Sequence, residues 1–418
     1  MTDPGKQGWR SRLRPRYHGG LLADPFDLIA EADVVASRVR EVFTPHQPIQ
    51  PGYMLAGRGA EISRVVQVLN TPGQHVLLYG DRGVGKSSLA NVATYAAHQA
   101  TMLRYYVKRC DHTDTFESIF REPLAVAGVD VQRVEYTAQE TTTTKQDAKL
   151  FDVVGVERER QRGSTTTYRP DGVIGAADAA RHLARLNGFM LIDELDVVQD
   201  PATRRKIAEL IKHLSDSSAP FTLFLVGIAD TAAELTDGHK SVQRSLRETK
   251  LHRMSTDELS AIVRAGADAL RLRFKEDVVA EIARVSAGFP HFTHLLALKC
   301  AERAIRERAT VITLDSLPAA MATAVDDAES TLQTQYARSI RSSSTTFRDV
   351  LIAAASLDED EFTVSQLRTR LPDGPNPARA LSKLSSPAGA TILRHLTRGV
   401  YRFTDPRMRS YIRIIEPT

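Results

Sequence analysis

The stretch YGDRGVGKSSLA, from Tyr79 to Ala90, decides the fold. Its spelling is Gly80-x-x-x-x-Gly85-Lys86-Ser87, with the apolar run HVLLY leading into it and a helical pattern after it. Glycines in this pattern let backbone N–H groups turn inward around phosphate oxygens, and the amino end of the following helix adds partial positive charge. The stretch therefore predicts a P-loop between a buried strand and a helix.

In a P-loop, two side chains as well as the backbone bind the nucleotide and its metal ion. We expect Lys86 to reach the β- and γ-phosphates of a nucleotide and the Ser87 hydroxyl to hold Mg²⁺. ATP and Mg²⁺ are therefore the predicted cofactors. The residues predicted to bind nucleotide in this loop are Gly80, Asp81, Arg82, Gly83, Val84, Gly85, Lys86, Ser87 and Ser88.

Hydrolysis needs a second acidic strand end, and FMLIDEL at 189–195 supplies one. We expect Asp193 to orient Mg²⁺ through its water shell and Glu194 to polarise the attacking water. Strands that end in solvated acids are common. Because this one follows a complete P-loop by one strand–helix set, it favours a Mg²⁺-dependent ATPase.

Buried strands and amphipathic helices alternate from Met54 to a strand at 221–228, and the pattern then becomes helical up to the C-terminal segment. The strand candidates HVLLY, GFMLIDELD and FTLFLVGIAD are mostly apolar, which is typical of a parallel sheet covered by helices on both faces. The fold class is therefore α/β, with a parallel-sheet P-loop core. We divide the chain into a basic tail, helix and linker (1–53), a P-loop core (54–250), an α-helical lid (251–325), and a linker with a winged-helix domain (326–418).

Two stretches interrupt this order. Residues 132–173 are rich in threonine and charge around the apolar run LFDVVGVE. Either a β-hairpin insertion with mobile ends or a solvated loop fits this composition. The first 20 residues are basic and lack the apolar segment of a secretory signal. They are interpreted either as a loose tail or as an arm that contacts nucleic acid or a neighbouring subunit.

The C-terminal segment has three short helical patterns followed by the strand candidates ATILRHL and VYRFTD, which match a winged helix. Cations along its third helix and wing can pair with DNA phosphates, whereas the acidic cluster LDEDEF opposes DNA binding. DNA binding and protein docking therefore both stay open. The cations are Arg379, Lys383, Arg394, Arg398 and Arg402, with Arg407, Arg409 and Arg413 beyond them.

Composition restricts the class of protein. The chain has 418 residues, too many for one ordinary core, and its 25% charged residues and net charge of +4 fit a soluble globular protein. Two cysteines, Cys110 and Cys300, make neither a disulfide framework nor a metal cluster. No apolar run approaches the roughly 20 residues that span a bilayer. We expect a cytoplasmic protein without a membrane partner.

With these motifs in place, the chain resembles an AAA+ ATPase of the origin-recognition and replication-initiator branch, over about residues 54–310 and with the winged helix in the same order. The stretch LAGRGAEISRVVQVL resembles the box that cups adenine, which implies that Gly57 and Arg58 bind nucleotide. LFLVGIAD resembles the sensor-1 strand, which implies a catalytic place for Asp230 beside the γ-phosphate. The family more often has Asn or Thr there.

The resemblance also implies an arginine finger. HKSVQRSLRETKLHRMSTDELSAIV resembles the segment that presents this catalytic cation to the next subunit, with Arg244 as the first choice and Arg247 as the second. A surface arginine without this role is the alternative. The implied partner is a further copy of the chain, in a homo-oligomer with nucleotide at its subunit interfaces.

The lid departs from the initiator pattern. Where those relatives carry an arginine as sensor 2, this chain has Gly288-Phe289-Pro290-His291. This sequence resembles the Gly-x-Pro motif of STAND signal-transduction ATPases and of bacterial transposition ATPases, which implies that Pro290 and His291 lie at the nucleotide. His291 equally fits a capping or packing role. The departure favours a bacterial regulatory or defence-type switch.

The expected function is an ATP-binding and ATP-hydrolysing AAA+ switch or motor that acts as an oligomer and associates with DNA through its winged helix. The alternative is a STAND-like nucleotide-gated signalling or anti-phage defence ATPase whose winged helix and insertion bind protein partners. A third possibility is a nucleotide-binding scaffold with little turnover.

Overall fold

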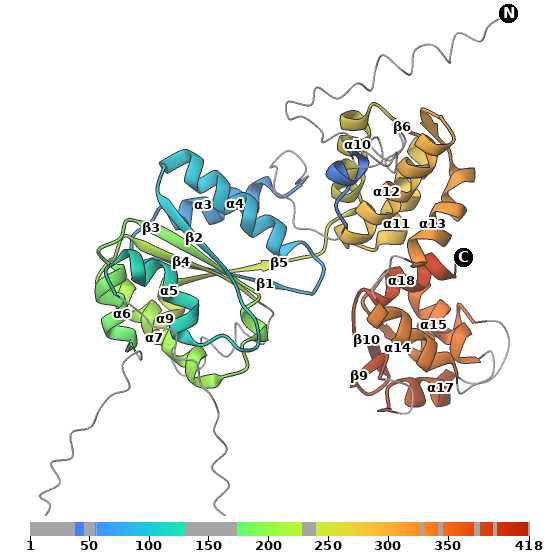
Figure 1. Cartoon of the computed structure of the whole chain (residues 1–418). Coiled ribbons are helices and arrows are strands. Elements are labelled where there is room, and N and C mark those ends of the chain that lie inside the picture. The colour runs from blue at the N-terminus through green and yellow to red at the C-terminus, as the bar shows by residue number, and fades with distance from the viewer. Residues whose placement is uncertain are drawn as a thin grey trace, which may run out of the picture.

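The protein structure, a computed structural model, describes residues 38–45, 55, 57–129, 174–227, 240–326, 330–341, 346–371, 377–387 and 391–416. A core built around one sheet forms one half, and a helical half carries the C-terminus (Figure 1). The insertion predicted at 132–173, the sensor residue Asp230 and the basic N-terminal tail lie outside the described residues.

The core sheet has five parallel strands in the order β2-β3-β4-β1-β5. They are β1 (His75–Gly80), β2 (Arg104–Arg109), β3 (Gly188–Asp193), β4 (Phe221–Gly227) and β5 (Leu246–Leu251). Strands β1, β3 and β4 are the predicted apolar runs, so the predicted α/β P-loop core is confirmed. Strand β5, at the sheet edge, was not predicted.

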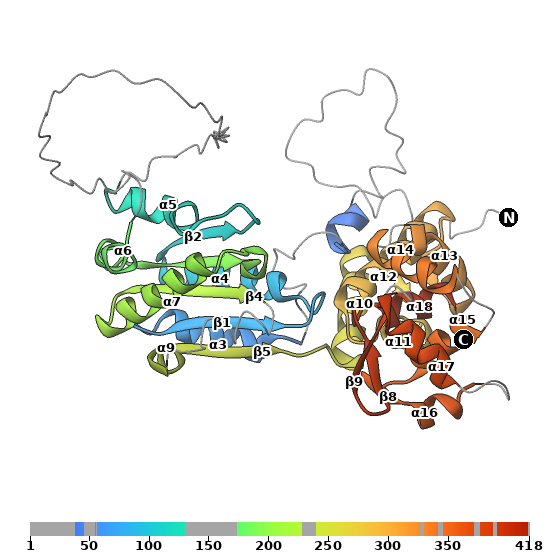
Figure 2. The same ribbon diagram turned by 90° about the horizontal axis from the view of Figure 1, so that it is seen from below.

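Helices cover both faces of this sheet (Figures 1 and 2). Helices α3 (Gly59–Leu69) and α4 (Lys86–Thr101) lie on one face. The other face carries α5 (Phe116–Val126), α6 (Ala176–Leu183), α7 (Pro201–Asp216) and α9 (Lys240–Ser245). Each face buries its own hydrophobic cluster, which makes the sheet the rigid base from which the P-loop projects.

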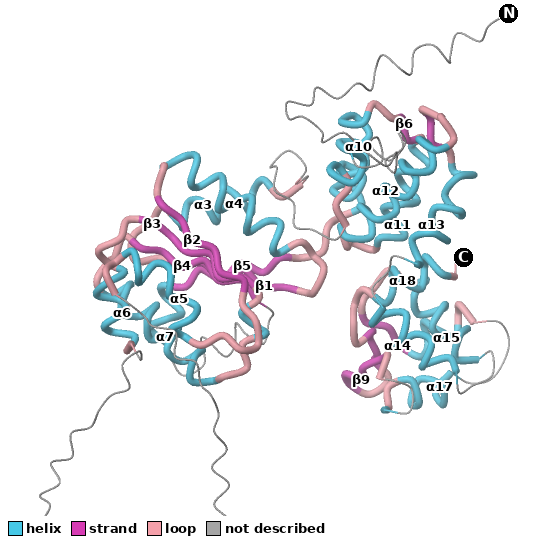
Figure 3. Tube along the Cα trace, viewed as in Figure 1, coloured by secondary structure: helices cyan, strands magenta, loops and turns pink. Residues whose placement is uncertain are grey.

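The lid follows β5 directly and is helical (Figure 3). Its helices are α10 (Thr256–Leu270), α11 (Glu276–Ser286), α12 (Pro290–Arg306) and α13 (Leu317–Asp326), joined by the short strands β6 (Arg273–Phe274) and β7 (Val311–Ile312) and by the 3₁₀ turn η3 (Leu314–Ser316). Ser255 caps α10 by accepting the Glu258 backbone N–H, while the Glu258 side chain accepts the N–H of Ser255. This reciprocal cap fixes the start of α10.

The C-terminal part has the predicted winged-helix form. It contains α14 (Ser330–Arg341), α15 (Thr346–Ser356), α16 (Val364–Arg368) and α17 (Pro377–Leu384), then the hairpin of β9 (Leu393–Thr397) and β10 (Val400–Phe403). Two elements were not predicted. Strand β8 (Glu361–Thr363) joins the hairpin in an antiparallel sheet, and helix α18 (Met408–Ile415) ends the fold.

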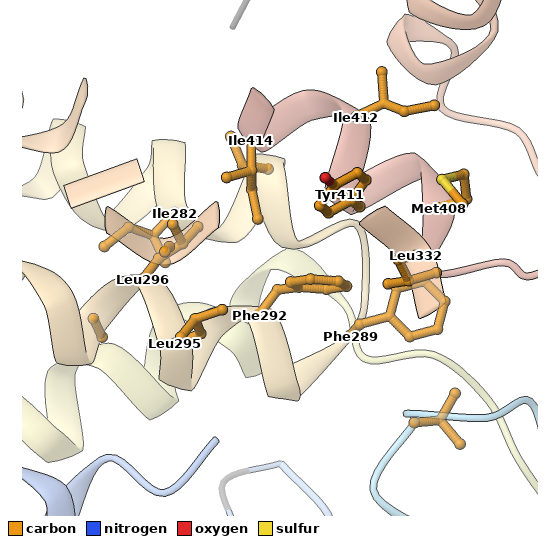
Figure 4. Close-up of a cluster of buried hydrophobic side chains, with 14 of the residues drawn as sticks. Ile282, Phe289, Phe292, Leu295, Leu296, Leu332, Met408, Tyr411, Ile412 and Ile414 are labelled. Atoms are coloured by element: carbon orange, nitrogen blue, oxygen red, sulfur yellow. The ribbon is translucent and has the colours of Figure 1, made fainter. Parts of the chain in front are cut away.

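Helix α18 packs against the lid, so the lid and the winged helix share one hydrophobic core (Figure 4). Met408, Tyr411 and Ile414 of α18 belong to the same buried cluster as Phe289 and Phe292 of the lid. Two hydrogen bonds reinforce the contact: Ser410 Oγ donates to the Ser286 carbonyl at 2.8 Å, and Arg413 Nη1 donates to the Arg284 carbonyl at 2.7 Å. The structure therefore holds the winged helix firmly on the lid.

Residues 38–45, which precede the core in sequence, also pack on the lid. Phe43 is fully buried against Phe274 and His294, with ring centroids 6.3 Å and 6.1 Å away. Gly266 makes room for it, because a Cβ there would lie 2.2 Å from Phe43 Cζ.

No helix among the described residues has the length and apolarity to cross a bilayer.

Candidate nucleotide site

The P-loop connects the end of β1 to the start of α4, as the sequence predicts. Gly83 and Gly85 have φ values of +84° and +92°, which side chains adopt only with strain. Gly85 caps α4 from this left-handed conformation, so the backbone N–H groups of the first helical turn face the loop. The loop therefore has the geometry of an anion site at a helix amino end.

Lys86 lies inside this loop. Its Nζ donates to the carbonyls of Gly80 and Asp81 at 3.1 Å and 2.9 Å. Burial lowers the pKa of Lys86 from its usual value, whereas the carboxylates of Asp196, Asp193 and Asp81 oppose this shift. The charge of Asp193, a predicted Mg²⁺ ligand, thus acts on Lys86, as does that of Asp196, to which the sequence pattern gave no role.

Asp193 and Glu194 lie at the carboxyl end of β3, but in different environments. Asp193 is buried, and its Oδ1 accepts the Glu194 backbone N–H at 2.9 Å. Glu194 is exposed and has a φ of +59°. This left-handed backbone conformation is unfavourable for any residue that has a Cβ atom. The two carboxylates are therefore suited to separate tasks, one fixed beside the loop and one facing solvent.

The oxygen donors at this site fit Mg²⁺. Ser87 at the start of α4 offers a hydroxyl and Asp193 offers a carboxylate, and Mg²⁺ prefers such ligands together with waters and phosphate oxygens. Within the described ranges, no group of three or more His, Cys, Asp or Glu residues could hold a metal ion alone.

Gly57 and Arg58, predicted at the adenine, tie the start of the core to the connection between β5 and α10. Arg58 is buried, and its Nη2 donates to the His252 carbonyl at 2.6 Å. Gly57, with a φ of +76°, lies against the side chain of Glu258. Both residues thus lie where the core meets the lid, and their contact with adenine stays a prediction.

Pro290 and His291 of the lid motif Gly288-Phe289-Pro290-His291 contact two different parts of the chain. Pro290 Cγ is 3.5 Å from the position that a Cβ on Gly85 would take, so Pro290 faces the P-loop. The His291 ring points elsewhere, since its Nδ1 is 2.7 Å from the carbonyl oxygen of Pro45. This contact favours the packing role for His291. Its binding to nucleotide stays a prediction.

The finger candidates lie at the opposite end of the sheet from the P-loop. Strand β5 runs parallel to β1, with Leu246 paired to His75 and Leu251 paired to Gly80. Arg244 precedes β5 and Arg247 follows its first residue, and both are exposed. At least four residues of strand, roughly 13 Å or more, separate them from the loop of their own chain. Arg244 and Arg247 therefore lie far from a nucleotide bound at the P-loop of their own chain.

A family model described as Novel STAND NTPase 1 matches residues 51–392. The chain belongs to this family. Membership confirms the STAND side of the resemblance and makes the chain a P-loop NTPase. No curated protein matches it.

Solved structures with a similar fold include the Walker-type ATPase PABY2304 of Pyrococcus abyssi. It has a TM-score of 0.52 and 16% identity, covering 88% of this chain and 99% of that one. The ORC2 protein of Aeropyrum pernix has a TM-score of 0.51 and 13% identity, covering 90% and 96%. At these identities the likeness to initiator ATPases is one of fold.

In this STAND NTPase the winged helix reaches the P-loop. A Cβ on Gly83 would lie 2.8 Å from Arg407 Cδ and 3.5 Å from Phe289 Cδ1, so Arg407 and Phe289 both lie against the loop. The Arg407 guanidinium pairs with Asp405, with Nη2 2.7 Å from Oδ2. Arg407 is buried and is therefore not among the exposed cations of the winged helix.

Two further arginines, which the sequence analysis named as possible contacts to DNA phosphates, are also structural. Arg409 and Arg413 are buried in α18. Arg413 donates to the carbonyls of Ala355 and Leu357 at 2.7 Å and 2.9 Å, and Arg409 donates to that of Asp358 at 2.9 Å. The sequence interpretation was wrong for these residues, because they hydrogen-bond to backbone carbonyls near the acidic cluster. Exposed cations remain at Arg379, Lys383, Arg394 and Arg398.

Proposed function

We propose that this STAND NTPase hydrolyses ATP with Mg²⁺ and uses the nucleotide to control the position of its winged helix. The observation that carries the proposal is the convergence on one loop: Gly83 of the P-loop lies against Phe289 of the lid and Arg407 of the winged helix. A change in the loop on nucleotide binding would act on both neighbours directly.

Each catalytic residue has a distinct task in this proposal. Lys86 pairs with the β- and γ-phosphates once its contacts to the loop carbonyls are exchanged for them. Ser87 and Asp193 hold Mg²⁺, which supplies positive charge to the phosphate oxygens when bound. Glu194, exposed at the end of β3, orients the attacking water.

Two residues complete the proposed site. Asp230 is assigned to the γ-phosphate only through the family resemblance. Arg244 is proposed to act on the nucleotide of a neighbouring copy, because it lies far from the P-loop of its own chain. The active form is therefore proposed to be a homo-oligomer, in which each subunit completes the next.

Turnover by single variants tests the ATPase proposal. The unchanged chain should hydrolyse ATP only with Mg²⁺, and Lys86→Ala should lose ATP affinity. Glu194→Gln should still bind ATP but turn over about 100-fold or more slowly, since it lacks the carboxylate that polarises water. Equal turnover by Glu194→Gln and the unchanged chain would remove Glu194 from the mechanism.

Duplex DNA binding is the second candidate function, and one observation favours it. Arg379 and Lys383 on α17, and Arg394 and Arg398 on the hairpin, are exposed, whereas the arginines of α18 are not. Helix α17 and the β9–β10 hairpin are the parts of a winged helix that approach DNA. Binding measured at two salt concentrations tests this, since phosphate contacts weaken steeply with salt.

The signalling alternative places a protein partner on the winged helix instead. DNA affinity that is absent at low salt, together with ATP-dependent assembly with a protein, would favour it over DNA binding. ATP turnover does not discriminate between the two, because both use the same P-loop site.

A further inference from the structure

Arg253 lies where the core, the lid and the winged helix meet. It belongs to the short connection between β5 and α10, and its Nη2 is 3.3 Å from Asp81 Oδ2 in the P-loop. Its Nη1 pairs with Asp360 beside β8 of the winged helix. The guanidinium also lies 4.6 Å from the ring centre of Phe289. One side chain therefore contacts all three parts of the chain.

Packing fixes the position of Arg253, but one of its N–H groups still lacks a hydrogen-bond acceptor. The side chain is 18% exposed, and a Cβ on Gly288 would lie 2.7 Å from Arg253 Cβ. Its Nε is buried and makes no hydrogen bond to any residue that the structure describes. A buried guanidinium nitrogen without an acceptor is costly, so an anion bound beside it would be stabilised.

Asp360 has a second cationic partner. Arg409 Nη1 lies 3.2 Å from Asp360 Oδ1, the same oxygen that Arg253 contacts. Burial lowers the pKa of Arg409 to about 10, and the charge of Arg253 adds to this shift, although Asp360 opposes it. Two guanidinium groups thus share one carboxylate. If Arg253 moved away, Asp360 would still be paired with Arg409.

From this arrangement we propose that Arg253 binds a phosphate of the nucleotide, and that the nucleotide and Asp360 compete for its guanidinium. The inference rests on the proposed ATP site. A phosphate carries more negative charge than a carboxylate and accepts two parallel bonds from a guanidinium, so ATP draws Arg253 away from Asp360. ATP binding then weakens the docking of the winged helix, and undocking strengthens ATP binding by the same factor.

Affinity for a slowly hydrolysed ATP analogue with Mg²⁺, measured on the full chain by calorimetry, tests the competition. Asp360→Asn should lower the Kd about two- to fivefold, the range expected for one partly exposed ion pair. Arg253→Gln should raise the Kd, and Arg253→Lys should restore only part of the affinity, because ammonium cannot form the two-pronged contact. Asp360→Asn added to Arg253→Gln should have no further effect.

The matched control is Asp358→Asn. Asp358 belongs to the same acidic cluster, but its side chain is 94% exposed and pairs with Arg413 rather than Arg253. Its replacement should leave the Kd unchanged. Hydrogen–deuterium exchange of α18 gives a second measurement: the analogue should speed exchange there in the unchanged chain and not in Arg253→Gln.

The outcomes separate this inference from the proposed function. If the unchanged chain binds the analogue and Asp360→Asn binds it equally well, the competition is wrong and the ATP site stands. An equal effect of Asp360→Asn with and without Arg253→Gln would also overturn it, because the effect would then not pass through Arg253. If the unchanged chain does not bind ATP at all, the proposed function fails and the inference fails with it.

Discussion

Arg407 lies so close to Gly83 that the P-loop has no room for a side chain there: a Cβ would be 2.8 Å from Arg407 Cδ. Asp405 holds the guanidinium end of Arg407 through two contacts, Nε to Oδ1 at 3.1 Å and Nη2 to Oδ2 at 2.7 Å. The arginine therefore cannot swing aside freely. The winged helix and the nucleotide loop thus fit each other only while this glycine is present.

Gly83→Ala should therefore loosen the winged helix. The change introduces both a clash with Arg407 and a side chain at a φ of +84°. Exchange of the α18 amides, measured without nucleotide, should become faster. Gly128→Ala is the control, since Gly128 has a φ of +83° but no atom within 4 Å of an added Cβ. Both variants carry the conformational cost, about 1 kcal/mol, but only Gly83→Ala should affect α18.

Acid should destabilise the core through His75. This residue begins β1, is fully buried, and its Nδ1 accepts the Leu223 N–H at 2.9 Å, which requires an unprotonated nitrogen. Burial lowers the pKa of His75 from 6.5 to about 3. The unfolded chain therefore binds more protons between these values, and the free energy of unfolding falls as pH drops from 6.5 toward 3.

The pH dependence of urea unfolding measures this contribution, which is on the order of 5 kcal/mol at its full extent. His75→Asn keeps an acceptor near the Leu223 N–H but does not titrate, so stability should depend less on pH between 7 and 5. His213→Asn, at an exposed position on α7, should leave the dependence unchanged. If the free energy of unfolding depends on pH equally in His75→Asn and in the unchanged chain, His75 is not the source of the pH dependence.

The N-terminal segment should contribute to the stability of the lid through Phe43. This side chain is fully buried and fills the space that Gly266 leaves. Phe43→Ala should reduce the free energy of unfolding by about 3 kcal/mol, because it removes a large buried side chain and leaves a cavity. Arg40→Ala is a fitting control, since the Arg40–Glu302 pair is mostly exposed on the arginine side. It should cost less than about 1 kcal/mol.

The parts of the fold that could be predicted are those whose chemistry requires a fixed spacing or a continuous apolar run. The P-loop needs glycines at positions where the backbone turns, and the buried strands β1, β3 and β4 show their burial directly in their composition. Strand β5 shows neither signal. It lies at the sheet edge, and only its end residues, Leu246 and Leu251, are buried. Polar edge strands of this kind resemble loops in sequence.

The role of α18 was missed for a different reason. Arginines in a winged helix suggest phosphate contacts, but a cation can equally satisfy buried carbonyls, and composition does not distinguish these uses. The available signal was the neighbourhood: Met408, Tyr411 and Ile412 surround Arg409 in sequence, which favours a buried helix. Arg253 carried no comparable signal, because its importance comes from three segments that meet only in the folded chain.

Arg413 and Arg398 should separate stability from DNA binding. Arg413→Met leaves the carbonyls of Ala355, Leu357 and Arg284 without their donor, so stability should fall by about 2–4 kcal/mol. Arg398→Met changes an exposed residue of the hairpin and should alter stability by less than about 0.5 kcal/mol. If the chain binds duplex DNA, Arg398→Met should weaken that binding and make it less sensitive to salt.

Mixing two inactive variants tests whether Arg244 acts between subunits. Arg244 lies at the opposite end of the sheet from the P-loop, so it should complete the site of a neighbouring copy. Alone, Arg244→Ala should bind ATP normally and turn over about 1,000-fold more slowly, the size of effect typical for an arginine finger. Lys86→Ala should be inactive because it does not bind ATP.

Mixed oligomers, however, contain interfaces that pair an intact P-loop from the Arg244→Ala copy with an intact arginine from the Lys86→Ala copy. Turnover should therefore reappear on mixing, and should increase with protein concentration as the oligomer forms. Arg247→Ala, mixed in the same way, tests the second candidate. If no mixture regains turnover while Arg244→Ala alone is slow, then Arg244 acts within its own chain, which the sheet geometry opposes. If Arg244→Ala keeps full turnover at every concentration, it is a surface arginine and the intersubunit site needs a different cation.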